Sequence, residues 1–299
     1  MSSSIIQHTV IGLAGLNLTN QEKAWLKKNT PKGVILFARN VKSPEQTKAL
    51  LADIRKYAGQ DIWLAIDEEG GRVHRMPWAP FDARTQAADF GALHKTDPDE
   101  AIKQVFQDSY QAGKALKDLG FTHNCAPVLD IFYAQGDPII GNRAYAENPD
   151  TIAVLGAACM LGLHDAGIEA IGKHFPGHGR ANADSHIAMP EVNTDLKTIL
   201  QEADAFPQLF VKGLKHTMTA HVAYPNIDKE VATFSKFWLQ DVLQDDMAFK
   251  GDIWSDDLCM KGCGMPIPEA ATKAMDAGCT VLLVCEPEGV QALMQAFSS

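Results

Sequence analysis

Two absences in the 299-residue sequence narrow the class of protein. No apolar run approaches the ~20 residues that cross a bilayer as a helix. Basic residues form no cluster, and the 27 Lys and Arg are outnumbered by 37 Asp and Glu, giving a net charge of -10. Because a phosphate-binding surface needs a basic patch, we expect neither nucleic acid nor a membrane as a partner.

Signs of secretion and of disulfide bonding are also missing. The N-terminal stretch MSSSIIQHTVIGLAGLNL has no basic segment and no small-residue cleavage site, so it is not typical of a signal peptide. The cysteines show no paired framework, and several lie in apolar runs, where Cys behaves as a small hydrophobe. These observations predict a cytoplasmic protein with reduced thiols. The six cysteines are Cys125, Cys159, Cys259, Cys263, Cys279 and Cys285.

Several signatures of metal and serine chemistry are lacking. There is no HExxH motif, no GxSxG motif, and no histidine after the first apolar run, where barrel metallohydrolases present an HxH pair. Cys259 and Cys263 supply half of a zinc site at most, because no second closely spaced pair exists. We therefore expect no metal and no cofactor.

The sequence does contain short apolar runs that alternate with helical patterns. Continuous apolar runs are typical of strands buried on both faces, as in a parallel sheet. The eight runs are Thr9–Leu13, Gly33–Phe37, Ile62–Ile66, His123–Leu129, Glu169–Phe175, His216–His221, Asp252–Ser255 and Thr280–Val284.

The segments between these runs carry signals for helix starts. Thr19 with Glu22, and Ser43 with Gln46, match the capping box, and three prolines follow N-cap residues (Pro44, Pro98 and Pro149). Eight βα units in a chain of this length predict a (β/α)8 TIM barrel, with a doubly wound open sheet as the alternative. No linker-like composition interrupts the chain, so we expect one α/β domain spanning residues 1–299.

Polar side chains follow the carboxyl ends of five consecutive runs, where a barrel places its active site. The opposite strand ends look featureless. A lysine inside an apolar strand, such as Lys173, must find a partner. The candidates at the polar end are Asp67 and Arg75 in DEEGGRVHR, Arg143 in GNRAY, Lys173 and His174 in the fifth run, and the SDDL carboxylates.

Each of these motifs also has a purely structural interpretation. Gly70 and Gly71 suit a turn with positive φ, Arg143 suits a surface ion pair, and SDDL suits a helix N-cap. His123 and His221 are each more typical of structural than of catalytic histidines.

The segment Lys173–His186, KHFPGHGRANADSH, concentrates imidazole in a glycine-broken loop. His174, His178, Asp184 and His186 are possible metal ligands by type. Without the metal signatures, a carboxylate at the seventh strand and an Asp–His pair on this loop favour glycoside chemistry instead.

Taken together and in order, DEEGGRVHR, GNRAY, KHFPGHGRANADSH, MTAHVAYP and SDDLCMKG resemble glycoside hydrolase family 3. The similarity is strongest to its single-domain bacterial cytoplasmic β-N-acetylglucosaminidases, or β-hexosaminidases. It runs from GVILFARNV through AGCTVLLVC and so covers nearly the whole chain. Tyr145 and the CMKG stretch depart from the usual family residues.

The resemblance implies a role for each matched residue. Asp256 would be the nucleophile, His186 the acid/base, and Asp184 the group that orients His186. Asp257 would be a structural neighbour. The sugar-binding residues would be Asp67, Arg75, Arg143, Lys173 and His174.

The resemblance also implies a substrate. The expected activity is the retaining removal of terminal N-acetylglucosamine from N-acetylglucosaminyl-1,6-anhydro-N-acetylmuramyl peptides in peptidoglycan recycling, by a cytoplasmic enzyme that we expect to be a monomer. Two alternatives remain open, a phosphorylase on the same fold and a non-catalytic sugar-binding protein.

Overall fold

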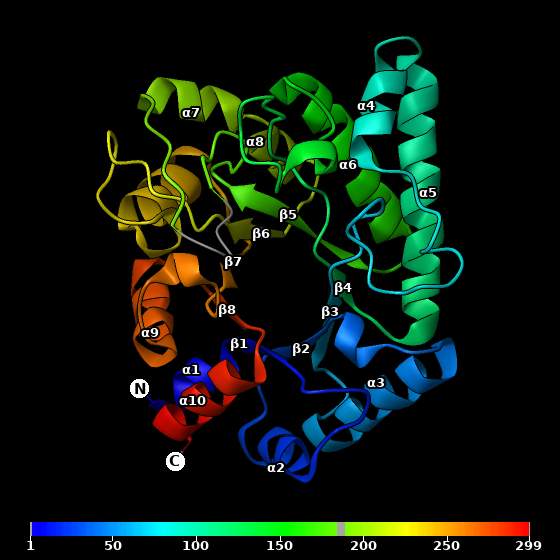
Figure 1. Ribbon diagram of the computed structural model, residues 1–299, viewed down its shortest axis with the longest axis vertical. Helices are drawn as coiled ribbons and strands as arrows, with labels where there is room; N and C mark the ends of the chain where they lie inside the picture. The colour runs from blue at the N-terminus through cyan, green and yellow to red at the C-terminus, as the bar shows by residue number, and fades with distance from the viewer. Residues whose placement is uncertain (1, 184–188, 299) are drawn as a thin grey trace.

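Eight parallel strands close into a barrel in the computed structural model, which describes residues 2–183 and 189–298 (Figure 1). The strands pair in chain order, and β8 pairs with β1. The (β/α)8 prediction is therefore confirmed, and the open-sheet alternative is wrong. The strands are β1 Thr9–Gly12, β2 Gly33–Leu36, β3 Trp63–Ile66, β4 His123–Asn124, β5 Glu169–Phe175, β6 His216–Thr219, β7 Asp252–Asp257 and β8 Val281–Val284.

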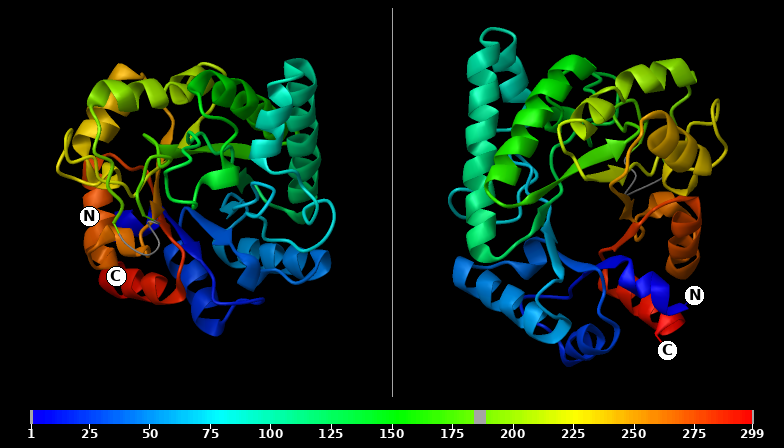
Figure 2. Two further views of the ribbon diagram at one scale, coloured as in Figure 1. Left: turned by 45° about the horizontal axis from the view of Figure 1, so that its top comes forward. Right: turned by 180° about the vertical axis from the view of Figure 1, so that it is seen from behind.

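Helices surround the barrel, and the first and last of them, α1 and α10, lie side by side (Figures 1 and 2). The described part of the chain has no helix that is both long and apolar enough to span a membrane. The α-helices are α1 Ser2–Gln7, α2 Asn20–Asn29, α3 Pro44–Ala58, α4 Ala87–His94, α5 Pro98–Leu119, α6 Pro149–Asp165, α7 Leu196–Glu202, α8 Ala205–Phe210, α9 Ile267–Ala277 and α10 Pro287–Phe297. The elements of 3₁₀ or π type are η1 Ala38–Asn40, η2 Gly141–Arg143, η3 Ala232–Phe234, η4 Phe237–Asp246 and η5 Lys261–Cys263.

Most helix starts follow the sequence signals. Thr19 and Glu22 form the complete capping box before α2. Before α3, Ser43 accepts the N–H of Gln46, but the Gln46 side chain accepts the N–H of Lys42 instead of that of Ser43. This second box is therefore only half formed. Proline occupies the first turn of α3, α5 and α6, where its missing N–H has no helical partner to lose.

Strand β4 is shorter than the apolar run that predicts it. The run extends to Leu129, whereas regular pairing stops at Asn124. Pro127 lacks the N–H that a regular ladder requires. The segment still pairs irregularly with β5, because Lys173 N–H donates to Pro127 O at 3.1 Å and Leu129 N–H donates to Lys173 O at 2.6 Å.

Side chains alternate between the barrel interior and the helix layer. Along β3, Ala65 belongs to the interior cluster, while Leu64 and Ile66 belong to the cluster beneath the helices. This period of two continues past the strand end. It aims Asp67 into the barrel mouth and Glu68 outward, and only Asp67 of the two lines the cavity there.

The amino ends of the strands are not featureless, and that expectation is wrong. Trp63, His123, His216 and Trp254 pack their rings together at this end, with the Trp63 and His123 centroids 4.4 Å apart. The Lys32 ammonium lies 4.2 Å from the Trp63 ring centroid. These residues are far apart in sequence, so no local motif marks the cluster. His123 has a structural environment, in agreement with its sequence interpretation.

Burial of His123 makes the barrel sensitive to acid. Burial, together with neighbouring His216 and Lys32, lowers the pKa of His123 to about 3. The unfolded chain binds this proton near pH 6.5 and the folded chain does not, so stability falls as the pH drops below about 6.5 and continues to fall until about 3. We predict a loss on the order of 2 kcal/mol from this one group between pH 7 and pH 5.

Chemical denaturation of His123→Phe at both pH values tests this. The variant should lose less stability on acidification than the wild type. His94→Phe, on α4, serves as the control and should keep the wild-type pH dependence. An unchanged dependence in His123→Phe would contradict the assignment.

Candidate functional site

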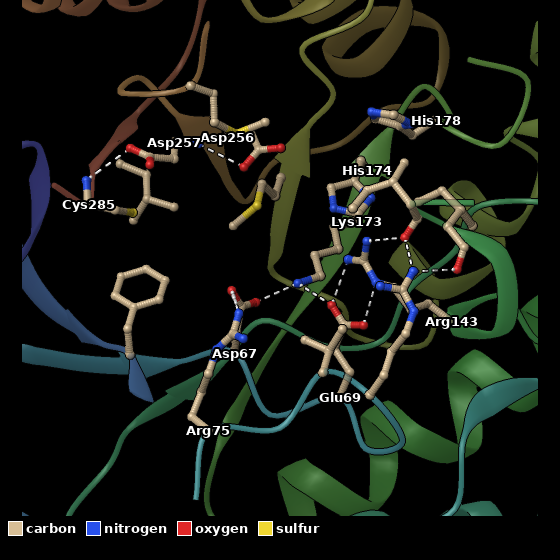
Figure 3. A pocket seen from close by; sticks show the side chains of 18 of the residues that line it. Asp67, Glu69, Arg75, Arg143, Lys173, His174, His178, Asp256, Asp257 and Cys285 are labelled. Carbon is tan, nitrogen blue, oxygen red and sulfur yellow. Dashed lines mark hydrogen bonds and ion pairs between the residues drawn. The ribbon is translucent and has the colours of Figure 1, made fainter. Parts of the chain in front are cut away.

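A cavity of ≈ 540 Å³ opens at the carboxyl ends of the strands. Its wall takes side chains from the ends of strands β2 to β8 or from the loops that follow them. All five sugar-binding candidates and the nucleophile candidate line this one cavity: Asp67, Arg75, Arg143, Lys173, His174 and Asp256. Figure 3 shows how these side chains face one another.

The ammonium group of Lys173 lies at the centre of the charged network. Its Nζ is 2.6 Å from Asp67 Oδ1 and 2.7 Å from Glu69 Oε1 (Figure 3). The lysine side chain is 3% exposed, so solvent screens both contacts less than it screens a surface ion pair. Burial opposes the charge, yet Asp67 and Glu69 raise the pKa of Lys173 above its usual value. Lys173 thus has the oppositely charged partners that a buried lysine in an apolar strand requires.

Two arginines complete the network. Arg75 Nη2 is 3.1 Å from Asp67 Oδ2, and Arg143 grips Glu69 with two contacts of 2.8 Å each. Against the effect of burial, Lys173 and Arg75 hold the pKa of Asp67 well below its usual range. Against the same effect, Arg143 and Lys173 lower the pKa of Glu69 to about 2. The site therefore presents two ionised carboxylates held by three cations. Arg143 is a cavity residue, and its surface interpretation is wrong.

The sequence interpretation gives no role to two carboxylates of this site, and Glu69 is the first. It lies two residues after Asp67, and period-two alternation places both carboxylates on the same side of the chain. The second is Asp130, which lies directly after the fourth apolar run. Its Oδ2 is 2.5 Å from His174 Nδ1, and its Oδ1 accepts the backbone N–H of His178 at 2.6 Å. Asp130 thereby orients the His174 ring within the cavity wall.

The carboxylates of the SDDL motif have different environments. Both residues line the cavity, but their hydrogen bonds differ: Asp256 Oδ1 accepts the N–H of Asp257 at 2.8 Å. Asp257 Oδ1 accepts the N–H of Cys259 at 3.0 Å and that of Cys285 at 2.9 Å, which ties the end of β7 to the loop after β8. Burial raises the pKa of Asp257. The carboxylate of Asp257 is thus engaged by the backbone, as expected of a structural neighbour.

His221 contacts the backbone at the same end of β7. Its Nδ1 is 2.7 Å from Thr233 Oγ1, and its Nε2 is 3.1 Å from the backbone oxygen of Asp257. Burial lowers the pKa of His221, which favours the neutral ring. These contacts agree with a structural histidine.

The described part of the histidine-rich loop is anchored to the barrel. Gly179 packs so closely that a Cβ there would lie 1.9 Å from Ile131 O, which only glycine permits. Arg180 pairs with Glu202 at 2.6 Å and lies over the Tyr133 ring. Asp184 and His186 lie outside the described residues. The chain returns at Met189, whose Cε packs near Gly264 in the loop after β7.

His178 lines the cavity near His174, with ring centroids 5.9 Å apart. Burial, together with His174, lowers the pKa of His178. Within residues 2–183 and 189–298, no group of three or more His, Cys, Asp or Glu side chains is arranged to hold a metal ion.

Comparison with known proteins shows which family the chain matches. Residues 4–299 match the model of the glycosyl hydrolase family 3 N-terminal domain. The chain is 36% identical over 292 residues to a beta-hexosaminidase of Stenotrophomonas maltophilia, covering 96% of this chain and 86% of that protein. It is 38% identical over 282 residues to a beta-hexosaminidase of Thiobacillus denitrificans, covering 92% of this chain and 77% of that protein.

The chain is also similar to solved structures of proteins with related names. NagZ from Neisseria gonorrhoeae, in complex with N-trifluoroacetyl-D-glucosamine, superposes with a TM-score of 0.90 at 34% identity, covering 97% of this chain and 85% of that one. A family 3 beta-N-acetylglucosaminidase from Paenibacillus superposes with a TM-score of 0.91 at 29% identity, covering 99% of this chain and 57% of that one.

The network predicts a large effect of removing its central cation. Lys173→Met removes the ammonium group that both carboxylates contact and leaves Asp67 with Arg75 and Glu69 with Arg143, and removing one partner from a buried ion-pair network costs up to about 3–5 kcal/mol. We expect a loss of that size in the free energy of unfolding by urea denaturation. Lys215→Met is the matched control, because the Lys215 side chain is 68% exposed and should cost less than about 1 kcal/mol. Equal effects of the two substitutions would contradict the central role of Lys173.

Proposed function

The chain belongs to glycosyl hydrolase family 3, and from this premise we propose that it is a retaining β-N-acetylglucosaminidase. The observation that carries the proposal is the placement of Asp256 on the cavity wall across from the Lys173 network (Figure 3). The proposed nucleophile and the charged network around Lys173 therefore line the same cavity. The names of the relatives, beta-hexosaminidase and beta-N-acetylglucosaminidase, support the same activity.

The charged network has the chemistry of a sugar-binding site. Carboxylates and forked guanidinium groups make strong, directional hydrogen bonds to hydroxyl groups. Asp67, Arg75, Arg143, Lys173 and His174 are proposed to bind the hydroxyls and N-acetyl group of one N-acetylglucosamine. Because ion pairs with one another, with Glu69 and with Asp130 hold these side chains in place before the sugar arrives, little conformational entropy is lost on binding.

Asp256 is proposed to attack the anomeric carbon. The new bond joins its carboxylate oxygen to C1, and the bond from C1 to the leaving oxygen breaks, which gives a covalent glycosyl-enzyme. Water then attacks C1 from the face that the leaving group vacated, and the bond from C1 to the Asp256 oxygen breaks, which regenerates the free carboxylate. Two inversions give net retention.

His186 is proposed to protonate the leaving oxygen and later to deprotonate the attacking water, with Asp184 orienting its ring. Imidazole has a reference pKa near ~6.5, so it can perform both steps at neutral pH. The position of Met189 supports the proposal, since the chain leaving residues 184–188 reaches the loop that follows Asp256 and β7.

The natural substrate is proposed to be an N-acetylglucosamine-terminated peptidoglycan fragment, hydrolysed in the cytoplasm by a monomer. We further propose that residues 1–299 act as one catalytic domain, which is supported by the family match over residues 4–299.

Loss of the Asp256 carboxylate tests the mechanism. Asp256→Asn should lower kcat for an aryl N-acetyl-β-glucosaminide by at least ~10³-fold, because the amide is a poor nucleophile. Asp257→Asn is the matched control and should retain far more activity. Proton NMR of the wild-type reaction should show the β-anomer as the first product. An α-anomer first, or equal losses in both variants, would refute the assignment.

The role of His186 is tested through the leaving group. His186→Ala should slow alkyl glycosides, which need protonation, far more than a dinitrophenyl glycoside, which does not. Asp184→Ala should show the same pattern in milder form. The comparison is of kcat/KM across a series of leaving groups. Equal losses for good and poor leaving groups would assign the proton to another residue, with His178 the next candidate.

A further inference from the structure

Glu68 is a buried carboxylate that the proposed reaction does not use. It directly follows Asp67, is 0% exposed, and points away from the cavity toward the helix layer. Asn124, at the end of β4, holds the backbone of Glu68 through two hydrogen bonds of 2.9 Å each. Asn124 Oδ1 accepts the N–H of Glu68, and Asn124 Nδ2 donates to Glu68 O. Glu68 is therefore held rigidly behind the sugar-binding network.

The carboxylate of Glu68 supports the loop that carries Arg75. Its Oε2 accepts the backbone N–H of Arg75 at 2.9 Å. The guanidinium of the same Arg75 reaches forward to Asp67 Oδ2 at 3.1 Å. Arg75 is thus held by consecutive carboxylates, Glu68 at its backbone and Asp67 at its side chain.

We propose that Glu68 is a positioning residue for the Arg75–Asp67 pair, and that the charge on its carboxylate controls how firmly this pair binds the sugar. The inference rests on the proposed function, because it assigns Arg75 and Asp67 to the sugar site.

The surroundings of Glu68 leave its charge only partly compensated. Arg84 Nη1 is 3.9 Å from Glu68 Oε1, but Arg84 is engaged more closely by Asp108 of α5, at 2.7 Å, and by Glu68 O, at 2.8 Å. Among the described residues, Glu68 Oε1 has no hydrogen-bond partner. The other titratable groups near Arg84 are the buried Cys159 of α6 and Tyr145, whose pKa values burial raises, so both stay neutral near pH 7.

Burial raises the pKa of Glu68 to about 7, against the opposing effects of the Arg75 N–H and of Arg84. The group therefore changes charge in the neutral range. Above that pH the ionised carboxylate is a strong acceptor for the Arg75 N–H, and below it the neutral acid is a weaker one. Asp67 and Glu69 stay ionised throughout, since their pKa values are lowered.

The direction of the effect follows from these charges. Sugar binding should tighten as the pH rises through about 7, because Arg75 is then held more firmly. The free energy of unfolding should change with pH in the opposite direction. The raised pKa means that the folded chain keeps a proton that the unfolded chain releases, so the contribution of Glu68 to stability is present at low pH and declines between about 4.5 and 7.

The decisive experiment measures N-acetylglucosamine binding by calorimetry between pH 5.5 and 8.5. The wild type should bind severalfold more tightly at pH 8.5 than at pH 5.5. Glu68→Gln should lose this difference and bind at every pH as the wild type does at pH 5.5, since the amide oxygen is a neutral acceptor. Glu147→Gln, at an exposed site, is the control and should retain the wild-type profile.

A second variant keeps the test independent of how well Glu68→Gln folds. Asp108→Asn leaves Arg84 to pair with Glu68 alone, so the inflection in the binding profile should move to lower pH. Wild-type binding with an unchanged profile in Glu68→Gln, or an unshifted inflection in Asp108→Asn, would overturn the coupling alone. Failure of the wild type to bind at any pH would contradict the proposed function, and the coupling with it.

Discussion

The site depends on one buried ammonium group. Lys173 is the one cation that contacts both Asp67 and Glu69, and its side chain is almost fully buried between them. Arg75 and Arg143 each hold only one of the two carboxylates. With the ammonium between them, both stay ionised and both orient an arginine. The side chains that we propose to bind the sugar are therefore held in place by ion pairs before any sugar is bound.

The barrel determines which side chains can join this network. Parallel strands bring their carboxyl ends to one rim, so residues separated by more than 100 positions, such as Asp67 and Lys173, meet there. Alternation along the chain then divides neighbours between two environments. Asp67 and Glu69 face the cavity, whereas Glu68 faces the helices and contacts the same loop from behind. One short stretch thus supplies both carboxylates of the cavity wall and the group that supports the loop behind them.

Much of this was predictable because the controlling patterns are local. Apolar runs, N-cap residues and prolines are read within a few positions, and they predicted the eight strands and the barrel. The need of Lys173 for a partner followed from its place in an apolar strand. The roles of Glu69 and Asp130 could not be assigned from sequence because they arise from pairing with Arg143 and His174, which lie far along the chain. The ring cluster around His123 was missed for the same reason, since its members are single residues in separate strands.

The central claim is that Asp256 bonds to the anomeric carbon of a sugar held by the Lys173 network. Incubation with a 5-fluoro-N-acetylglucosaminyl fluoride should trap the glycosyl-enzyme, since the ring fluorine slows its hydrolysis. Digestion and mass spectrometry should place one sugar on Asp256. A sugar found on Asp257 or on any other residue would contradict the account.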